Sequence, residues 1–417
     1  MAQRSDSVLV VGGGIIGLAC AHYLSEAGFS VTVIDRGNIG GECSYANCGY
    51  VCPSHILPLN TSATLKKGLA SLFQPRAPFR FKPQLRLGMY RWFWEFARRC
   101  GHETMLAAGH HLAPLLESSL HEYRQLMSTE ALDVEWQASG LLYVFQTQAG
   151  FDDYSETDRL LTTEFGESAK RIEGAALPAV EPALRDDLAG AFLYEDDGFL
   201  RPDKLIRGWQ SLLASNGVTF VPQNPMTGVR RANDAITAIE TVKGNMTADH
   251  YVFATGAWSA KLAQMIGCRL PIEPGKGYSV TMTRPVQCPS LPMLFPEHGI
   301  GVTSFERHFR LGSMMEFVGF DDSIPEHRIE QLKDAAAPYL YEPIGEETVE
   351  TWFGWRPMTW DSLPIIGRVP TAKNALVATG HNMLGLTLAP ATGRLIAELV
   401  GEQSTHLSVD AFSPTRF

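Results

Sequence analysis

Apolar residues run without a break near the start of the chain and then recur at helical spacing. Ser7–Val11 is a short run rich in β-branched residues, typical of a strand buried on both faces of a parallel sheet. After a cluster of glycines, the segment from Ile15 to about Ala27 predicts a helix that Gly28 ends. Ser30–Ile34 repeats the pattern of a buried strand. Together these residues predict a strand, a tight turn, a helix and a second, parallel strand.

The rest of the chain alternates between two kinds of segment. Residues 65–127 read mostly as helix, and residues 270–317 are rich in short strands. Strand–turn–helix units return at 250–267 and 375–401. We therefore expect an α/β fold in which a Rossmann-type domain is interrupted by an inserted, discontinuous α+β domain, with the ligand at their interface. The predicted segments are 1–64, 196–268 and 352–417 for the first domain, and 65–195 and 269–351 for the second.

The glycines after the first strand form the sequence G-x-G-x-x-G. Gly12 lets the chain turn, Gly14 lets the backbone approach a pyrophosphate, and Gly17 lets the helix pack closely on the sheet. Asp35 ends the second strand, where a carboxylate accepts hydrogen bonds from a ribose diol. This spacing predicts a dinucleotide site without separating FAD from NAD. Arg36 beside the acid keeps NADP open, because an arginine there suits a 2′-phosphate.

Composition excludes several classes of protein. The formal net charge of −10 argues against nucleic acid as a partner, which requires a basic face. The sequence contains no run of 18 apolar residues, and its start is unlike a secretory signal. Seven scattered cysteines indicate reduced thiols rather than a metal site or disulfides. These features favour a cytoplasmic protein without a bound metal.

Six segments, in order along the chain, resemble those of a known family, the D-amino-acid oxidase-like FAD-dependent oxidoreductases. Within it, the similarity is greatest to the catalytic (small) subunits of bacterial D-amino-acid dehydrogenases. Cys48 departs from the family pattern, which has alanine there, and His55 stands where those dehydrogenases commonly have no histidine. The segments are SYANCG (44–49), ATGAWS (254–259), KGYSVT (276–281), GSMMEFVGFD (312–321), GWRPMTWDSLPIIG (354–367) and TGHNMLGLTLAPATGRLIAEL (379–399).

The resemblance implies FAD as the cofactor. Relatives that tether FAD covalently through a histidine carry it where Ala46 stands here, so non-covalent FAD is expected. The positive end of the helix that begins near Gly385 would stabilise negative charge on the reduced flavin ring, and Thr387 could donate a hydrogen bond there. The residues expected to contact the cofactor are Gly12, Gly13, Gly14, Ile15, Ile16, Gly17, Asp35, Arg36, Ser44, Asn47, Cys48, Gly49, Val229, Ala254, Thr255, Gly256, Gly380, Gly385, Leu386 and Thr387.

Three residues are candidates for direct contact with a substrate. Arg356 is, apart from Asp361, the only charge in the aromatic segment 351–367. In the family the arginine of this strand holds the substrate carboxylate by two parallel hydrogen bonds, which its planar fork suits. The alternative is an ion pair with Asp361 or Glu350. Tyr278 and His55 are weaker candidates, the first as a core tyrosine or a carboxylate ligand and the second as a loop cap or a ligand of a substrate hydroxyl.

The implied activity is oxidative deamination of a D-amino acid. A hydride passes from the α-carbon to flavin N5, and the imino acid hydrolyses to a 2-oxo acid. Related alternatives are dehydrogenation of a cyclic D-imino acid such as cis-4-hydroxy-D-proline, which His55 and Cys48 keep open, and a glycine- or sarcosine-type oxidation. Two alternatives of other classes are a non-catalytic FAD-bearing subunit and an NADP-dependent reductase. The latter needs a second glycine loop, which the sequence does not show.

The electron acceptor is left open between oxygen and a quinone. The segment MYRWFWEFARRC (89–100) combines aromatic residues with Arg91, Arg98 and Arg99, and such a segment can lie on a membrane surface. Core packing with a solvated arginine face is the alternative. Because the dehydrogenases that this chain resembles pass electrons towards a quinone pool, a peripheral contact with the inner face of a bacterial membrane stays open.

Overall fold

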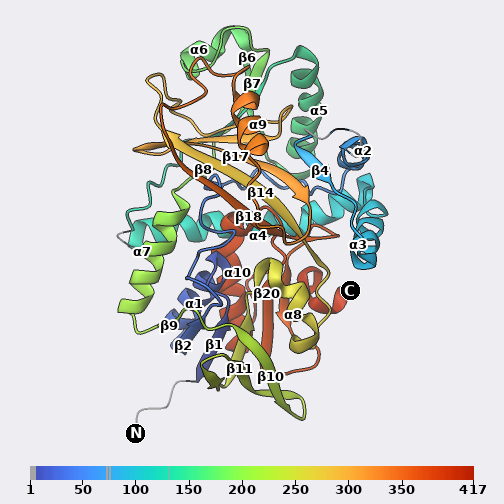
Figure 1. The fold of residues 1–417 in the computed structure, drawn as a ribbon, viewed down its shortest axis with the longest axis vertical. Coiled ribbons are helices and arrows are strands. Elements are labelled where there is room, and N and C mark those ends of the chain that lie inside the picture. The colour runs from blue at the N-terminus through green and yellow to red at the C-terminus, as the bar shows by residue number, and fades with distance from the viewer. Residues whose placement is uncertain (1–5, 72–73, 75–76, 131) are drawn as a thin grey trace.

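The computed structural model describes residues 6–71, 74, 77–130 and 132–417, with the side chains of residues 67 and 69 left out. Two sheets form the frame of the molecule (Figure 1). The smaller sheet lies in the lower half beside helices α1 (Ile15–Glu26) and α10 (Gly385–Val400). The larger sheet crosses the upper half, with α9 (Glu326–Ala336) and α5 (Gln148–Phe165) around it.

The smaller sheet has six strands, in the order β19-β20-β13-β1-β2-β9. All neighbours in this sheet are parallel except β19 and β20. Their carboxyl ends therefore open towards the larger sheet, where doubly wound folds bind nucleotides. The strands are β1 (Ser7–Val11), β2 (Ser30–Ile34), β9 (Thr219–Val221), β13 (His250–Phe253), β19 (Ile365–Arg368) and β20 (Ala375–Thr379).

The larger sheet has nine strands in the order β18-β14-β17-β16-β15-β5-β7-β6, and β4 also pairs with β17. The long strands β14 and β18 pair in antiparallel register, with Gly275 opposite Arg356. This pairing places the aromatic segment 351–367 over the centre of the molecule. The strands are β4 (Phe79–Phe81), β5 (Leu141–Phe145), β6 (Lys170–Glu173), β7 (Gly190–Tyr194), β14 (Ile272–Thr283), β15 (Met293–Phe295), β16 (Ile300–Ser304), β17 (His308–Phe317) and β18 (Thr348–Thr359).

The remaining elements surround these two sheets. A three-stranded sheet consists of β10 (Met226–Ala232), β11 (Ala235–Thr241) and β12 (Gly244–Met246), and β3 (Tyr50–Val51) pairs with β8 (Gly198–Phe199). Short 3-10 helices occur at 174–176, 256–258, 410–412 and 414–416. The other helices are α2 (Ser62–Ala70), α3 (Leu87–Ala97), α4 (His102–Thr129), α6 (Leu177–Val180), α7 (Pro202–Ser215) and α8 (Ser259–Ile266).

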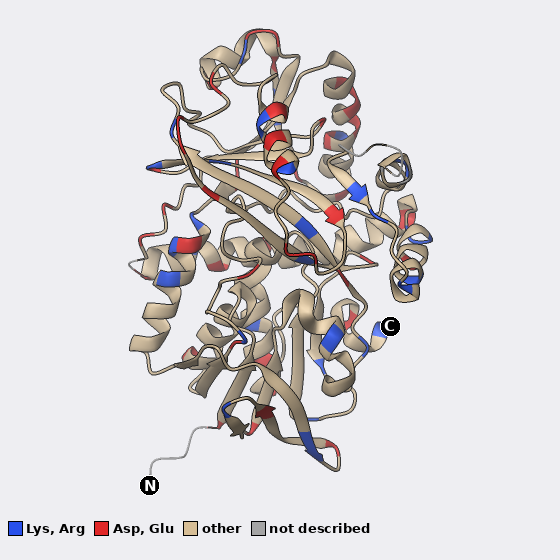
Figure 2. Ribbon diagram, viewed as in Figure 1, with Lys and Arg blue, Asp and Glu red and all other residues tan. Residues whose placement is uncertain are grey.

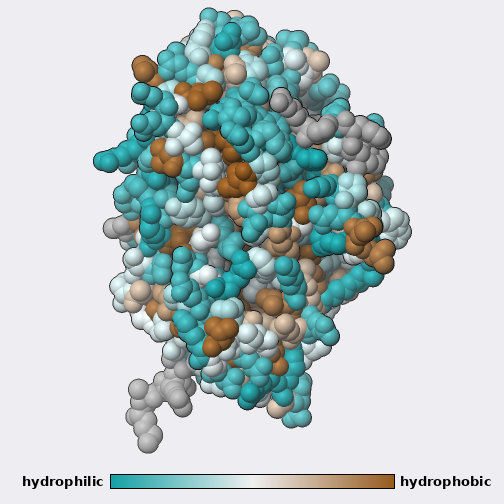
Figure 3. All heavy atoms as spheres, in the orientation of Figure 1, coloured by the Kyte–Doolittle hydropathy of each residue, from teal (hydrophilic) through white to brown (hydrophobic). Residues whose placement is uncertain are grey.

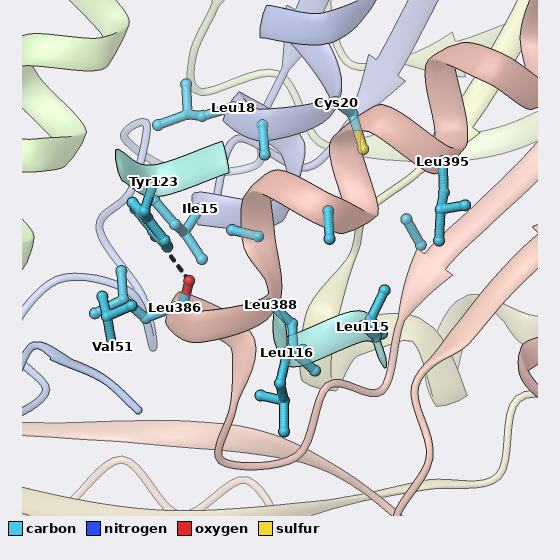
Figure 4. Close-up of a cluster of buried hydrophobic side chains, with 14 of the residues drawn as sticks. Ile15, Leu18, Cys20, Val51, Leu115, Leu116, Tyr123, Leu386, Leu388 and Leu395 are labelled. Carbon is cyan, nitrogen blue, oxygen red and sulfur yellow. Dashed lines mark hydrogen bonds between the residues drawn. The ribbon is translucent and has the colours of Figure 1, made fainter. Parts of the chain in front are cut away.

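Helix α4 joins the core formed by α1 and α10 (Figure 4). Its Tyr123 hydroxyl donates to the carbonyl of Leu386 at 2.7 Å, and its Ser119 hydroxyl donates to the carbonyl of Thr387 at 2.6 Å. These bonds fix the first turn of α10. The domain boundaries stay a prediction, and α4 is the element that fits them least, because it lies in a segment assigned to the second domain yet packs in the core of the first.

The helices and strands expected from the sequence are present with small shifts at their ends. Strands at Ser7–Val11 and Ser30–Ile34 are observed, as is the helix from Ile15, which ends at Glu26. Residues 65–127 are mostly helical, and β4 interrupts them. Within the described residues, no helix is long and apolar enough to cross a membrane. The first half of β18, TVETW, is polar and partly exposed, so the pattern of that half alone does not indicate a strand.

Candidate active site

A cavity of about 700 Å³ lies between the two sheets. Its lower wall is made by the loops that follow β1, β2, β13 and β20, and by the first turn of α10. Its upper wall is made by residues of β14, β17 and β18 and by Tyr143 of β5. One end therefore holds the glycine loop and Asp35, and another part holds Arg356 and His55.

The glycine loop is built for close approach of backbone to backbone. Gly12 has φ +111°, and a Cβ there would lie 2.3 Å from the carbonyl oxygen of Ala254. A Cβ on Gly17 would lie 1.8 Å from the carbonyl oxygen of Gly12. At both positions the nearest atom is a backbone atom, which cannot move aside as a side chain could. A residue with a Cβ is therefore excluded there. Gly12, Gly14, Ile15 and Ile16 line the cavity, whereas Gly13 and Gly17 stand behind it.

Asp35 ends β2 at the edge of the cavity. Its carboxylate accepts hydrogen bonds from the backbone amides of Gly13 at 2.8 Å and Gly37 at 2.7 Å. Burial raises the pKa of Asp35, and the two amides oppose that shift. Each carboxylate oxygen keeps a free lone pair, so the group can still accept from a diol.

Arg36 also lines the cavity, but its guanidinium is already engaged. It forms an ion pair with Glu42 and lies 3.5 Å above the ring centre of Trp258. The cation–π contact and the ion pair hold the arginine at the wall. This arrangement argues against Arg36 as the ligand of a 2′-phosphate, the feature that kept NADP open.

The loop at 44–49 is fastened to the upper sheet through three consecutive carbonyl groups. The carbonyls of Ala46 and Cys48 accept hydrogen bonds from Ser279 Oγ at 2.8 Å and Thr303 Oγ1 at 2.7 Å. The carbonyl of residue 47 accepts from Arg310 at 2.8 Å. Three different strands, β14, β16 and β17, supply these donors.

Three consecutive amide groups in the middle of the same loop are left without partners. The backbone N–H groups of Ala46, Asn47 and Cys48 donate to no residue that the structure describes. Ser44 accepts from the amide of Ile15 at 3.0 Å, so the loop lies directly over the start of α1. A buried amide without a partner is unfavourable, so these groups indicate a ligand that accepts hydrogen bonds in the cavity.

Cys48 fills space that its glycine neighbours leave. Its Sγ atom would lie 3.1 Å from a Cβ on Gly301 and 2.9 Å from one on Gly312. Burial raises the pKa of the Cys48 thiol. The thiol is therefore neutral near pH 7 and acts as packing between the loop and the sheet. Asn47 and Gly49 line the cavity beside it, and the Gly49 amide donates to Asn47 Oδ1 at 2.9 Å.

The strand ends of β13 and β20 are tied together next to the cavity. Ser259 Oγ lies 2.7 Å from Thr255 Oγ1 and 2.8 Å from Thr379 Oγ1. Ala254, Thr255 and Gly256 line the cavity, and Gly380 lies directly behind it at φ +71°.

Val229, in β10, does not line the cavity, whereas Asn224, Pro225 and Met226 at the start of the same hairpin do. The expected contact of Val229 with the cofactor stays a prediction. Trp258, Lys261 and Cys43 are further lining residues that were not foreseen.

The first turn of α10 presents free amides to the cavity. Gly385, Leu386 and Thr387 line it, and their N–H groups have no acceptor among the described residues. The Thr387 hydroxyl, by contrast, is in use: it donates to the carbonyl of Tyr50 at 3.2 Å and lies 3.3 Å from the amide of Cys52. The helix end rather than the threonine side chain is therefore the donor group at this wall.

Arg356 is a partly buried cation that faces the cavity without a carboxylate partner among the described residues. Its Nη1 donates to the carbonyl of Met314 at 2.7 Å, and no described carboxylate lies within 4.0 Å of it. The alternative of an ion pair is wrong, because Asp361 pairs with Arg416 and Glu350 lies beside Arg310.

The surroundings of Arg356 do not neutralise its charge. Burial lowers its pKa, and the neighbouring thiols of Cys43 and Cys48 oppose that shift. Burial also raises the pKa of Cys43 to about 11, so this thiol carries no charge at neutral pH. A guanidinium stays protonated in proteins, and an unpaired buried charge is costly. The site therefore favours an anion from outside the chain.

Tyr278 contributes to the cavity wall, but its side chain lies on the other face of β14. Its ring packs with Val280 and other residues beneath α9, and its hydroxyl donates to Glu316 at 2.5 Å. Ser279, the next residue, points to the cavity side. The hydroxyl is thus committed to a carboxylate behind the sheet and does not lie beside Arg356.

His55 lines the cavity close to Tyr143, and its Nδ1 lies 3.0 Å from the Tyr143 hydroxyl. Its other ring nitrogen, Nε2, makes no hydrogen bond with a described residue and is not among the fully buried unpaired atoms. Burial lowers the pKa of His55, so the imidazole is neutral at neutral pH. The structure thus brings His55 and Arg356 into one cavity.

These features fit a flavin dinucleotide. The glycine loop and α1 suit a pyrophosphate, Asp35 suits a ribose, and the free amides of loop 46–48 and of α10 suit a ring with several acceptor atoms. Ala46 offers no atom for a covalent tether. No group of three or more potential metal ligands occurs in the described part of the chain.

Comparisons with known proteins agree with this geometry. The family model described as FAD dependent oxidoreductase (DAO) matches residues 7–399. The chain is 31% identical to a D-amino acid dehydrogenase of Granulibacter bethesdensis over 401 residues, covering 94% of this chain and 95% of the relative.

Solved structures share the fold. A glycine oxidase of Geobacillus kaustophilus matches with a TM-score of 0.80 and 23% identity over 100% of both chains. An L-proline dehydrogenase of P. horikoshii matches with a TM-score of 0.73 and 19% identity over 99% of this chain and 98% of that one. The resemblance, the fold class and FAD as the cofactor are confirmed: the chain belongs to the DAO family of FAD-dependent oxidoreductases.

Proposed function

We propose that this protein is an FAD-dependent dehydrogenase or oxidase of D-amino acids, producing an imino acid that hydrolyses to a 2-oxo acid. The observation that carries the proposal is the unpaired guanidinium of Arg356 in the cavity. A carboxylate matches this fork by two parallel hydrogen bonds. The identity of 31% with a D-amino acid dehydrogenase supports the D series.

The residues of the chain bind, orient and enclose the substrate. Arg356 holds the carboxylate and thereby fixes the position of the α-carbon. Such positioning raises the reaction rate more than tighter binding alone would. The buried walls around Arg356 exclude water, which strengthens that interaction. Bound FAD supplies the hydride acceptor. The free amides of loop 46–48 and of α10 supply positive dipoles at the walls where negative charge would develop.

Non-covalent binding of the cofactor is part of the proposal, and so are the contacts expected from the sequence that line the cavity. The hydrogen bonds from Gly13 to Asp35 and from Ile15 to Ser44 order the walls that would hold the cofactor without a tether. Acid precipitation should release all the yellow colour into the supernatant. Colour that stays with the precipitated chain would contradict this part.

A cyclic D-imino acid is a second candidate substrate. The polar nitrogen of His55 in the same cavity favours it over glycine, which has no side chain to reach that group. The product separates the two reactions: a ring imine releases no free ammonia, whereas a primary amino acid does.

A peripheral contact with an anionic membrane surface is also proposed, with a quinone as the electron acceptor. Helix α3 buries Met89, Trp92 and Phe96 and exposes Leu87, Tyr90 and Trp94 on its other face. Figure 3 shows hydrophobic atoms at this edge of the molecule.

Segment 79–100 has six Lys and Arg residues against one Glu, in a chain of net charge −10. Figure 2 shows that charged residues of both signs are spread over the remaining ribbon. Aromatic and basic side chains together suit a lipid headgroup layer.

The test of the activity is anaerobic bleaching of the purified holoenzyme. A panel of D-, L- and N-substituted amino acids is added in turn, and the flavin absorbance near 450 nm is followed. A D-amino or D-imino acid should bleach the absorbance while its mirror image does not. Bleaching by L-enantiomers alone, or by none of the panel, would contradict the proposal.

A further inference from the structure

The binding roles argued above for the cofactor and the carboxylate do not use the hydrogen-bonded pair of His55 and Tyr143. Both residues line the cavity, and they come from different parts of the chain, the loop after β3 and strand β5. His55 Nδ1 lies 3.0 Å from the Tyr143 hydroxyl, and their rings are 6.4 Å apart. The second ring nitrogen of His55 has no partner among the described residues.

A chain of contacts relates this pair to Arg356. The carbonyl of Met314 accepts from Arg356, and the amide of Met314 donates to the carbonyl of Gly299 at 3.4 Å. The amide of Gly299 donates to Phe295, whose neighbour Leu294 pairs with Tyr143 in the sheet. Phe295, Pro296 and Gly299 of the turn at 295–299 line the same cavity as Arg356 and His55.

A neutral imidazole has one donor and one acceptor nitrogen. Because Nδ1 is used by Tyr143, that bond sets which hydrogen-bonding role Nε2 presents to the cavity. The ring of Tyr143 also packs beside two other tyrosines: it lies 5.5 Å from the ring of Tyr154 and 5.2 Å from that of Tyr194. An unpaired polar atom in such a wall favours a ligand that can hydrogen-bond to it.

We propose that His55 is the residue that selects substrates with a small polar group, above all a hydroxyl, at the side-chain end, and that Tyr143 positions it. This inference rests on the proposed amino-acid oxidation and deepens it by naming the substrate class. Substrates that end in a methyl group leave Nε2 unpaired, so the site rejects them relative to hydroxyl analogues of the same size.

The experiment compares isosteric pairs with the holoenzyme: D-serine against D-2-aminobutyrate, and D-threonine against D-valine. The readout is the ratio of kcat/KM within each pair. The wild-type protein should favour the hydroxyl member roughly tenfold or more, as expected when a buried hydrogen bond is lost. His55→Phe should bring the ratio close to one, and His55→Asn, which keeps a donor and an acceptor, should restore part of it.

Two further variants separate positioning from packing. Tyr143→Phe removes only the hydroxyl and should lower the ratio while the methyl substrates keep their kcat. Tyr154→Phe removes a hydroxyl from the same aromatic cluster that bonds to Tyr194 and does not line the cavity. It should leave the ratio unchanged. A lowered ratio in Tyr154→Phe as well would assign the effect to packing and overturn the role of Tyr143.

The outcomes distinguish this inference from the function on which it rests. Equal rates within the pairs in the wild-type protein, or a preference that survives in His55→Phe, would overturn the inference and leave the amino-acid oxidation standing. Failure of every amino acid to bleach the flavin would overturn both. The comparison of substrate pairs in the wild-type protein needs no variant. Equal rates there would overturn the inference even if His55→Phe does not fold.

Discussion

Gly277 of β14 lies directly against the guanidinium of Arg356 on β18: a Cβ built on Gly277 would be 2.2 Å from Nη1. The absence of a side chain at residue 277 thus creates the space in which the cation sits. The backbone of β14 and the carbonyl of Met314 hold Arg356 from two sides and leave the third side open to the cavity.

The first prediction follows from that contact. Gly277→Ala should displace the guanidinium and raise KM for amino acids about tenfold or more, because a small misplacement of a binding group is costly. FAD content should not change, since Gly277 lies on the substrate side. Gly88→Ala is the matched control, because nothing lies within 4 Å of a Cβ there. An unchanged KM in Gly277→Ala would contradict the proposed role of Arg356.

Removal of the cation itself is a second test. Arg356→Ala should raise KM and lower kcat/KM by an amount equivalent to roughly 2–5 kcal/mol, the usual effect of truncating one partner of a buried charge pair. Arg356→Lys should recover only part of this loss, because an ammonium lacks the planar fork. Steady-state kinetics with an artificial electron acceptor measure both.

The control for Arg356 is Arg159→Ala, which removes an exposed arginine in α5. Its kinetics should equal those of the wild-type protein. Intact FAD absorbance combined with unchanged KM in Arg356→Ala would assign the arginine a structural role only.

The hydrogen bonds that hold loop 44–49 against the larger sheet give a third prediction. Thr303→Val removes the hydroxyl that donates to the carbonyl of Cys48 and should weaken FAD binding by about 1 kcal/mol, the typical worth of one such bond. Thr219→Val, at an exposed position of β9, is the control. Titration of the apoprotein with FAD measures the affinity. Equal affinities in the two variants would mean that the loop is held without this bond.

The sequence predicted the cofactor end of the site better than the substrate end. Gly12 and Asp35 belong to a local motif whose spacing alone specifies a turn, a helix and a strand end, and the structure places both as expected. The setting of Arg356 depends on pairing of β14 with β18, which are far apart in the chain. Periodicity within a segment cannot supply that register.

Some errors could have been avoided from local pattern, and others could not. Tyr278 shares its strand face with Val280 and Met282, so the alternation already indicated a core position. Lys276 lies on that same face, fully buried, and its Nζ pairs with Asp321 at 3.2 Å. Lys276 stands between two glycines, and nothing in the local sequence signals a partner 45 residues away. Burial of a charge is decided by such distant partners.

A buried carboxylate outside the cavity gives a pH-dependent prediction. Asp197 accepts hydrogen bonds from the amide and hydroxyl of Ser54, and burial raises the pKa of Asp197 to about 7. The folded chain thus binds this proton more tightly than the unfolded chain, in which the pKa is near 4. Its contribution to stability is therefore largest at low pH and is lost as pH rises towards 7.

Asp197→Asn should remove the loss of stability that accompanies ionisation of Asp197 as pH rises. The free energy of unfolding of the variant relative to the wild-type protein should increase between pH 5 and pH 7, by up to about 1.4 kcal/mol for each pH unit. Denaturant titrations at several pH values measure it. Asp187→Asn, at an exposed carboxylate in another part of the chain, is the control. A relative stability that stays flat for Asp197→Asn would show that Asp197 is ionised throughout.

The exposed face of α3 provides the last prediction, which concerns the membrane. Leu87 is 89% exposed and Trp94 is 60% exposed, although both are large apolar side chains. Lys82 and Arg91, near them, form no ion pair with a described residue and are free to meet lipid phosphates. The protein should therefore float with vesicles that contain phosphatidylglycerol and not with vesicles of phosphatidylcholine alone. Binding should weaken as salt is added, because exposed charges are screened.

The apolar contribution is separated from the charge by substitution. Leu87→Ser with Trp94→Ser should reduce vesicle binding about tenfold or more, since each side chain that enters the interface contributes apolar burial. Val286→Ser, at a residue that is 98% exposed elsewhere on the surface, is the matched control and should bind like the wild-type protein. Equal flotation of all three proteins would assign the binding to charge alone. Absence of flotation in the wild-type protein would remove the membrane contact from the proposed function, whereas the chemistry at Arg356 would be unaffected.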